Sequence, residues 1–162
     1  MTKFLFFLVL LLPPKISLAE TVINPFEYVL KNSEFGKQNG TTRFYLDIND
    51  DKKLDIFAGE RWSGNTGGTY FVFLKENKGY RLLGKIYLHP QGFQLLEKKH
   101  NGLRDIINYH HLSAFDGYLV TYHFDGKNYV EVSKKNMESK AFDAVIKPTL
   151  VKGLDAGPDE KW

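Results

Sequence analysis

Short runs of alternating apolar and polar residues dominate the chain between Thr42 and Ser133. Alternation with a period of two is typical of strands that bury one face, and turn residues separate these runs at intervals of about 10 residues. The pattern predicts strands over residues 42–46, 54–58, 69–74, 80–88, 92–96, 105–109, 117–124 and 128–133. We therefore expect an all-β fold with one or two short helices, its antiparallel sheets forming a sandwich or two related β-repeats.

Local signals place the turns and the helices. The Asp-Gly pair at 125–126 favours a tight hairpin turn, since both residue types tolerate positive φ. Asn24 followed by Pro25 is typical of a helix start and predicts a short helix over residues 24–30. A further short helix is predicted within residues 133–142.

The first residues have the pattern of a secretory signal peptide. Lys3 gives a positive start, Phe4 to Leu12 is an unbroken apolar run, and small residues precede a cleavage position after Ala19. A bilayer span needs about 20 apolar residues, more than this run supplies, so we expect no membrane insertion after signal cleavage. The sequence predicts a signal peptide at 1–19, a single β-rich domain at 20–152 and a flexible C-terminal tail at 153–162.

Composition narrows the location and the partners. The chain carries 22 Lys and Arg residues, 19 Asp and Glu residues and no cysteine. Without cysteine, neither disulfides nor thiolate metal sites can form, which suits a bacterial periplasm or exterior better than a eukaryotic secreted module. The chain shows no basic stripe with interleaved aromatic residues, so nucleic acid is not favoured as a partner. It shows no cationic amphipathic helix that would favour a membrane surface.

The two halves of the chain share a weak internal repeat. Shifting the sequence by 50 residues aligns Asp55 with Asp105, Ile56 with Ile106, and Gly67 with Gly117, and it keeps the order of turns and strands. Either the domain arose by duplication, or the spacing is the one at which any β-rich chain repeats turns and strands.

The stretch YLDINDDKKLDIFAGE, residues 45–60, crowds carboxylates between two predicted strands. Hard cations such as Ca²⁺ take six to eight oxygen ligands, which a loop supplies from alternate side chains, a backbone carbonyl and a closing carboxylate. The spacing D-x-N-x-D-x-x-x-D provides this set, and the predicted ligands are Asp47, Asn49, Asp51, the carbonyl of Lys53, and Asp55. The alternative is a solvated turn that keeps this shape without an ion.

These residues resemble the calcium loops of FG-GAP and VCBS-type repeats, as in integrin-like blades. The family motif, D-x-[DN]-x-D-G-x-x-D followed by a short apolar strand and glycine, is matched by DINDDKKLDIFAG through Gly59. The resemblance implies a Ca²⁺ loop that braces β structure and is not catalytic. Lys52 departs from the motif, because the sixth position is normally a glycine with positive φ. A non-glycine residue in that conformation costs on the order of 1 kcal/mol.

The repeat gives this loop a second, degenerate copy around NGLRDII, residues 101–107. Asp105 and the turn residues Asn101 and Gly102 are kept, but Glu97 occupies the first ligand position and Lys99 the third. We interpret the second copy as one that retains the turn geometry without the calcium ligands.

Histidines are the other residues with metal-binding or catalytic potential. His111, His123 and Glu60 would suit zinc if the fold brought them together, which nothing in the sequence indicates. His110 and His111 are neighbours on a predicted strand, so they point to opposite faces and cannot share one ion.

We expect a periplasmic or secreted non-enzymatic binding module whose acidic loop takes Ca²⁺ and whose partner is another protein, for example as an inhibitor or immunity-type protein. Ser63 and Ser113 lack a nucleophile motif. One alternative is a periplasmic hydrolase that uses a histidine cluster drawn from His110, His111 and His123. The other is a carbohydrate-binding module that holds a glycan on exposed aromatic residues, such as Trp62 beside the glycine-rich stretch 63–69.

Overall fold

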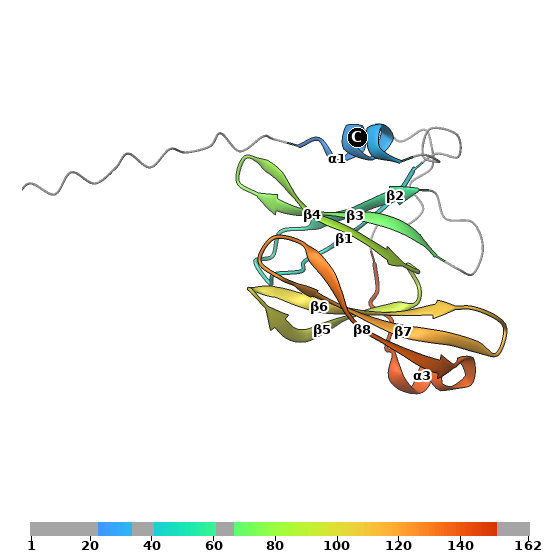
Figure 1. Cartoon of the computed structure of the whole chain (residues 1–162). Helices are drawn as coiled ribbons and strands as arrows, with labels where there is room; N and C mark the ends of the chain where they lie inside the picture. Colours follow the sequence, from blue (N-terminus) through green and yellow to red (C-terminus); the bar gives the residue numbers. More distant parts are fainter. Residues whose placement is uncertain (1–22, 34–40, 61–66, 152–162) are drawn as a thin grey trace, which may run out of the picture.

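The protein folds into two four-stranded antiparallel sheets, each with its strands in chain order (Figure 1). This computed structural model describes residues 23–33, 41–60 and 67–151, so the predicted signal peptide, the tail and Trp62 lie outside the described residues. The first sheet contains β1 (Thr41–Leu46), β2 (Asp55–Glu60), β3 (Gly68–Glu76) and β4 (Gly79–Leu88). The second contains β5 (Phe93–His100), β6 (Leu103–His111), β7 (Asp116–Phe124) and β8 (Tyr129–Glu138). The predicted all-β, sandwich-like fold is confirmed, and each predicted strand coincides with an observed one.

The first predicted helix is present as α1 (Pro25–Asn32). Its Asn24 cap accepts hydrogen bonds from the backbone N–H groups of Phe26 and Glu27, at 3.0 and 3.4 Å, which satisfies donors that a helix start leaves unpaired. Within the described residues, no helix has both the length and the apolar character needed to cross a membrane.

The helix predicted within residues 133–142 is wrong over most of its length. β8 continues to Glu138, which pairs with Asp116 of β7. Only then do a short 3₁₀ turn, η1 (Ser139–Ala141), and the short helix α3 (Phe142–Val145) follow. Ladder hydrogen bonds to β7 therefore outweigh the helix propensity of this lysine-rich segment, which forms an exposed sheet edge.

The two sheets bury one continuous hydrophobic core between them. Phe93 of the second sheet lies 5.6 Å from Phe44 and 6.4 Å from Phe57 of the first, between ring centroids. The outer face of the first sheet forms a second, smaller cluster with α1, in which Val29 packs with Phe71 and Phe73. The order of layers is thus helix, first sheet, second sheet (Figure 1).

Two hairpin turns follow their sequence signals. Asn101 and Gly102 join β5 to β6 with φ angles of 48° and 86°, the positive values that a tight primed turn needs. Gly126, between β7 and β8, has φ of 104°. The carboxylate of Asp125 in the same turn accepts hydrogen bonds from the N–H groups of Lys127 and Asn128, both at 2.7 Å.

Truncating the ring that joins the two sheets tests this packing. Because Phe93 is fully buried between the aromatic rings of the other sheet, Phe93→Ala should lower the free energy of unfolding by about 3–5 kcal/mol. Urea denaturation followed by circular dichroism measures the change. The matched control is Phe115→Ala, which removes an exposed ring and should stay within about 0.5 kcal/mol of the parent protein. Equal losses in the two variants would contradict the assignment of the core.

Candidate metal centres

The predicted calcium loop joins β1 to β2, and its carboxylates point back toward the loop's own backbone. Asp47 accepts hydrogen bonds from three N–H groups of the loop, those of Asn49, Asp51 and Lys52. The side chains of Asn49 and Asp51 each accept one more, from the amide two residues further on. Lys52 has φ of 68°. The chain therefore adopts a left-handed conformation at the position where the motif has glycine. The side chain of Lys52 makes this conformation strained.

Asp55, the last predicted ligand, connects this loop to the first sheet. Its side chain is fully buried, and it accepts hydrogen bonds from the N–H groups of Ile48 at 2.9 Å and Lys75 at 2.7 Å. Burial raises the pKa of the Asp55 carboxyl to about 6, with a smaller contribution from the charges of Asp51 and Asp47, while the two amides oppose the shift. Three predicted ligands are thus close enough to act on one another electrostatically.

Positive side chains from the second sheet contact the acidic loop. Lys99 lies 2.6 Å from one carboxylate oxygen of Asp50 and donates a hydrogen bond to the carbonyl of Asn49. The guanidinium of Arg104 lies 3.5 Å from the other carboxylate oxygen of Asp50, and the backbone N–H of Arg104 donates to the carbonyl of Ile48 at 2.8 Å. The hydrogen bond from Lys99 holds the pKa of Asp50 below its usual range. The loop therefore packs against the β5–β6 hairpin, its counterpart in the internal repeat.

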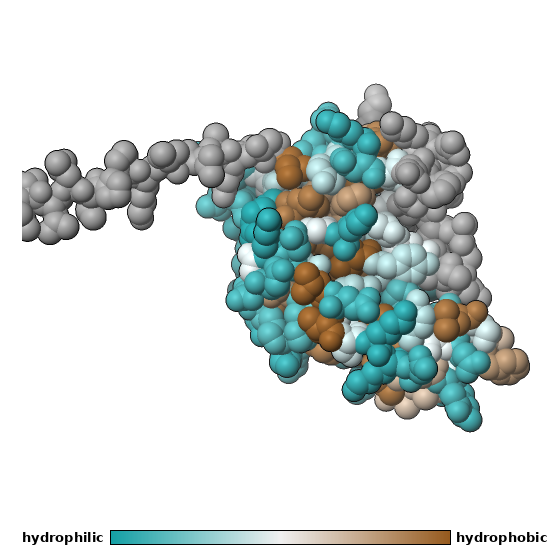
Figure 2. All heavy atoms as spheres, in the orientation of Figure 1, coloured by the Kyte–Doolittle hydropathy of each residue, from teal (hydrophilic) through white to brown (hydrophobic). Residues whose placement is uncertain are grey.

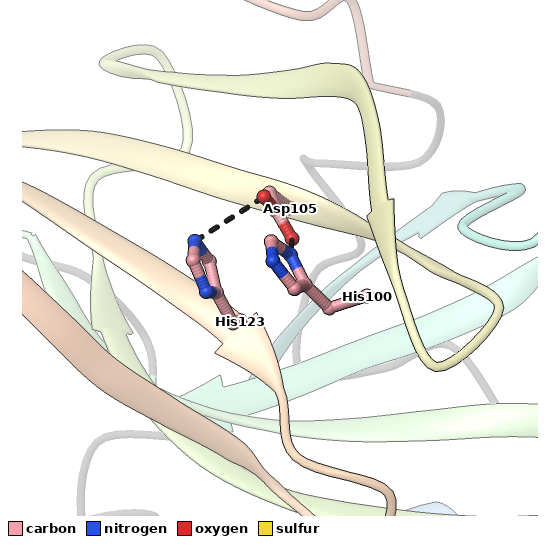
Figure 3. A group of neighbouring side chains, drawn as sticks. All are labelled: His100, Asp105 and His123. Atoms are coloured by element: carbon pink, nitrogen blue, oxygen red, sulfur yellow. Dashed lines mark hydrogen bonds and ion pairs between the residues drawn. The ribbon is translucent and has the colours of Figure 1, made fainter.

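A different set of side chains converges beside that hairpin (Figure 3). His100 ends β5, Asp105 lies on β6, and His123 lies near the end of β7. His100 Nδ1 is 2.6 Å from Asp105 Oδ1, and His123 Nε2 is 3.2 Å from Asp105 Oδ2. The two imidazole rings stack, with 3.8 Å between centroids and 14° between planes. One carboxylate thus faces two imidazole nitrogens, one from each neighbouring strand.

The carboxylate of this cluster is buried, whereas its histidines reach solvent. Asp105 is 1% exposed, and its Oδ2 makes no hydrogen bond. The side chains of His100 and His123 are 34% and 25% exposed. Desolvation is the main cause that lowers the pKa of His123; Asp105 opposes it, and His100 and Lys98 add to it.

The ligand atoms of His100, Asp105 and His123 all lie within 4.8 Å of one another. Across the described ranges, this is the one group of three histidine or carboxylate ligands so close together, and the acidic loop does not form one. The calcium loop therefore stays a prediction. Sequence reasoning placed Asp105 in a degenerate loop copy and missed its partner His100. The available signal was the Asn-Gly turn, which folds β6 back along β5 and so brings His100 near Asp105.

The other predicted histidines do not join this cluster. His110 and His111 lie at the far end of β6, where they pair with Tyr118 and Gly117, while His123 lies beyond the Ile106–Tyr122 pair. His110 is buried and stacks between Tyr87 and Tyr118, at 4.9 and 4.8 Å. His111 contacts the rings of Tyr109 and Phe142. The side chain of Glu60, the third residue of the predicted zinc set, is outside the described part.

Comparisons of the chain with family models, with curated proteins and with solved structures gave no match. The resemblance to FG-GAP and VCBS-type loops therefore rests on the loop residues themselves.

The buried His110 predicts a specific pH dependence of stability. Burial lowers the pKa of His110 to about 4, with a smaller contribution from Lys134. As the pH falls below about 6.5, His110 of the unfolded chain takes up a proton, whereas His110 of the folded chain does so only near pH 4. The stability that depends on a neutral His110 is therefore fully present above about pH 6.5 and is lost as the pH falls from about 6.5 to about 4.

Denaturant unfolding of the parent protein and of His110→Phe, each from pH 7 to pH 4, tests this. The parent should lose about 3 kcal/mol more than the variant over this range. Parallel pH profiles would show that His110 does not titrate as a buried group.

Proposed function

We propose that this protein is an exported, non-enzymatic binding module that docks on another protein. The observation that carries the proposal is an exposed apolar tip at the end of the β6–β7 hairpin, made of Leu112 and Phe115. These side chains are 67% and 79% exposed. Figure 2 shows hydrophobic residues at this end of the molecule, at the lower right of the view. Aromatic residues such as phenylalanine are enriched at the core of protein interfaces.

Hydrogen bonds hold the tip in one shape. The N–H groups of Leu112 and Ser113 donate to the carbonyl of Asp116, at 2.9 and 3.0 Å. The hydroxyl of Ser113 accepts from the N–H groups of Phe115 and Asp116, so this serine serves the turn. The carbonyl of Phe115 accepts from the N–H of Ser139 at 2.8 Å, which ties the tip to the segment after β8. A tip ordered in this way loses little conformational entropy when a partner covers it.

The separation of His110 and His111 from His123 supports a binding role over the hydrolase alternative, which drew on these three histidines. In a hydrolase, the general base must lie within hydrogen-bond reach of the proton that it removes. His110 and His111 are separated from His123 by most of the length of β6, and His110 is buried between two tyrosine rings. The arrangement of these histidines therefore favours a binding module over a hydrolase.

Site-specific photo-crosslinking tests the docking tip. Benzoylphenylalanine placed at position 115, in bacteria that export the protein, should give a discrete protein adduct, and Leu112→Ser should weaken it. The control carries the same group at Lys78, which is exposed in the β3–β4 turn away from the tip. Equal labelling from both positions, or none from position 115, would contradict the proposal. An adduct with polysaccharide would support the carbohydrate-binding alternative instead.

We further propose that the acidic loop binds Ca²⁺ weakly and braces the junction of the two sheets. The support is the buried carboxylate of Asp55, whose pKa rises to about 6 partly through the charges of Asp47 and Asp51. A divalent cation would remove this repulsion, while the lysines around the loop and the loop's own amides compete with it. We therefore expect affinity in the range of extracellular modules, about 10⁻⁴–10⁻³ M.

Thermal melting at increasing Ca²⁺ measures this binding. At free Ca²⁺ about ten times the Kd, stability should rise by about 1.4 kcal/mol and Tm by a few degrees. Asp47→Ala should abolish the rise. Asp125→Ala, which removes an equivalent aspartate from the β7–β8 turn, should keep it. A melt that does not respond to Ca²⁺ at about 10 mM, ten times the weakest expected Kd, would exclude the calcium loop and leave the docking tip unaffected.

A further inference from the structure

We propose that His100, Asp105 and His123 form a second metal site, which takes a divalent transition-metal ion such as Zn²⁺. The site is separate from the calcium loop and from the docking tip.

Three adjacent strands supply the ligands. The order β5-β6-β7 puts the carboxylate strand between the two histidine strands. The Asn101-Gly102 turn brings His100 at the end of β5 back to Asp105 on β6, and the β6–β7 pairing brings His123 to its other side. The three ligand atoms lie within 4.8 Å of one another on these strands, and the two stacked rings would turn to bring both nitrogens to one ion.

The buried carboxylate is the observation that points to an ion. Burial of a carboxylate is costly unless its charge is balanced and its oxygens are bonded. Asp105 has one oxygen against His100 Nδ1, but its Oδ2 has no hydrogen bond, although His123 Nε2 is 3.2 Å away. That oxygen faces an imidazole nitrogen without a hydrogen bond to it, and an ion between the two atoms would bond both.

The donor set defines the class of ion. Two imidazole nitrogens and one carboxylate oxygen suit Zn²⁺, Cu²⁺, Ni²⁺ and Co²⁺, whereas Ca²⁺ prefers an all-oxygen shell. Zinc binds histidine nitrogen at 2.0–2.1 Å and usually has four ligands, so this site leaves a position for water or for a partner's side chain. The partial exposure of both histidines gives the ion a route from solvent.

Isothermal titration of the untagged chain with Zn²⁺ tests the proposal. The parent should bind one Zn²⁺ saturably at neutral pH. His100→Gln and His123→Gln should each weaken binding by at least about tenfold, because each removes a ligand. His111→Gln is the matched control and should leave the affinity unchanged. Asp47→Ala should also leave it unchanged, which separates this site from the calcium loop. Circular dichroism verifies that each variant is folded.

X-ray absorption of the zinc-loaded chain gives a second readout. The expected result is two imidazole ligands at 2.0–2.1 Å. Absence of saturable binding would overturn the proposal, as would binding that persists in both His100→Gln and His123→Gln. In either case, the three side chains form only a hydrogen-bonded network around a buried aspartate.

Discussion

The burial of two aspartates, one in each half of the chain, is the constraint on which this structure depends. Asp55 and Asp105 are 0% and 1% exposed, and each lies in the second strand of its sheet. A buried carboxylate destabilises a fold unless neighbouring groups bond its oxygens and balance its charge. The two halves of the protein place different groups around their buried carboxylate.

In the first half, the backbone supplies the partners. The amides of Ile48 and Lys75 donate to Asp55, so one side chain fixes the end of the acidic loop to β2 and to β3. In the second half, imidazole rings replace the amides, and Asp105 connects β5, β6 and β7 through His100 and His123. Contacts between the acidic loop and Lys99 and Arg104 then join the two halves. The two aligned positions therefore hold a carboxylate bonded by backbone amides in one half and a carboxylate within a histidine cluster in the other.

Much of the fold was predictable because it is encoded locally. Alternating residues and turn signals such as Asn101-Gly102 act over a few positions, so the strands, α1 and the sandwich-like class followed from the sequence. The helix predicted within residues 133–142 was wrong, because this lysine-rich segment pairs with β7 and that pairing is a tertiary interaction. The sequence indicated Asp105 only through its alignment with Asp55 in the internal repeat. Its partner His123 comes from a strand 18 positions away, and an irregularity between Leu95 and Lys99 shifts the β5–β6 register in a way that no local pattern reveals.

The most direct test is a crystal structure of the untagged chain grown with Zn²⁺, with anomalous diffraction recorded on both sides of the zinc edge. The expected result is an anomalous peak bonded to His100 Nδ1, His123 Nε2 and the carboxylate of Asp105. A map with no peak there, and with the Asp105 side chain turned out to solvent, would contradict it.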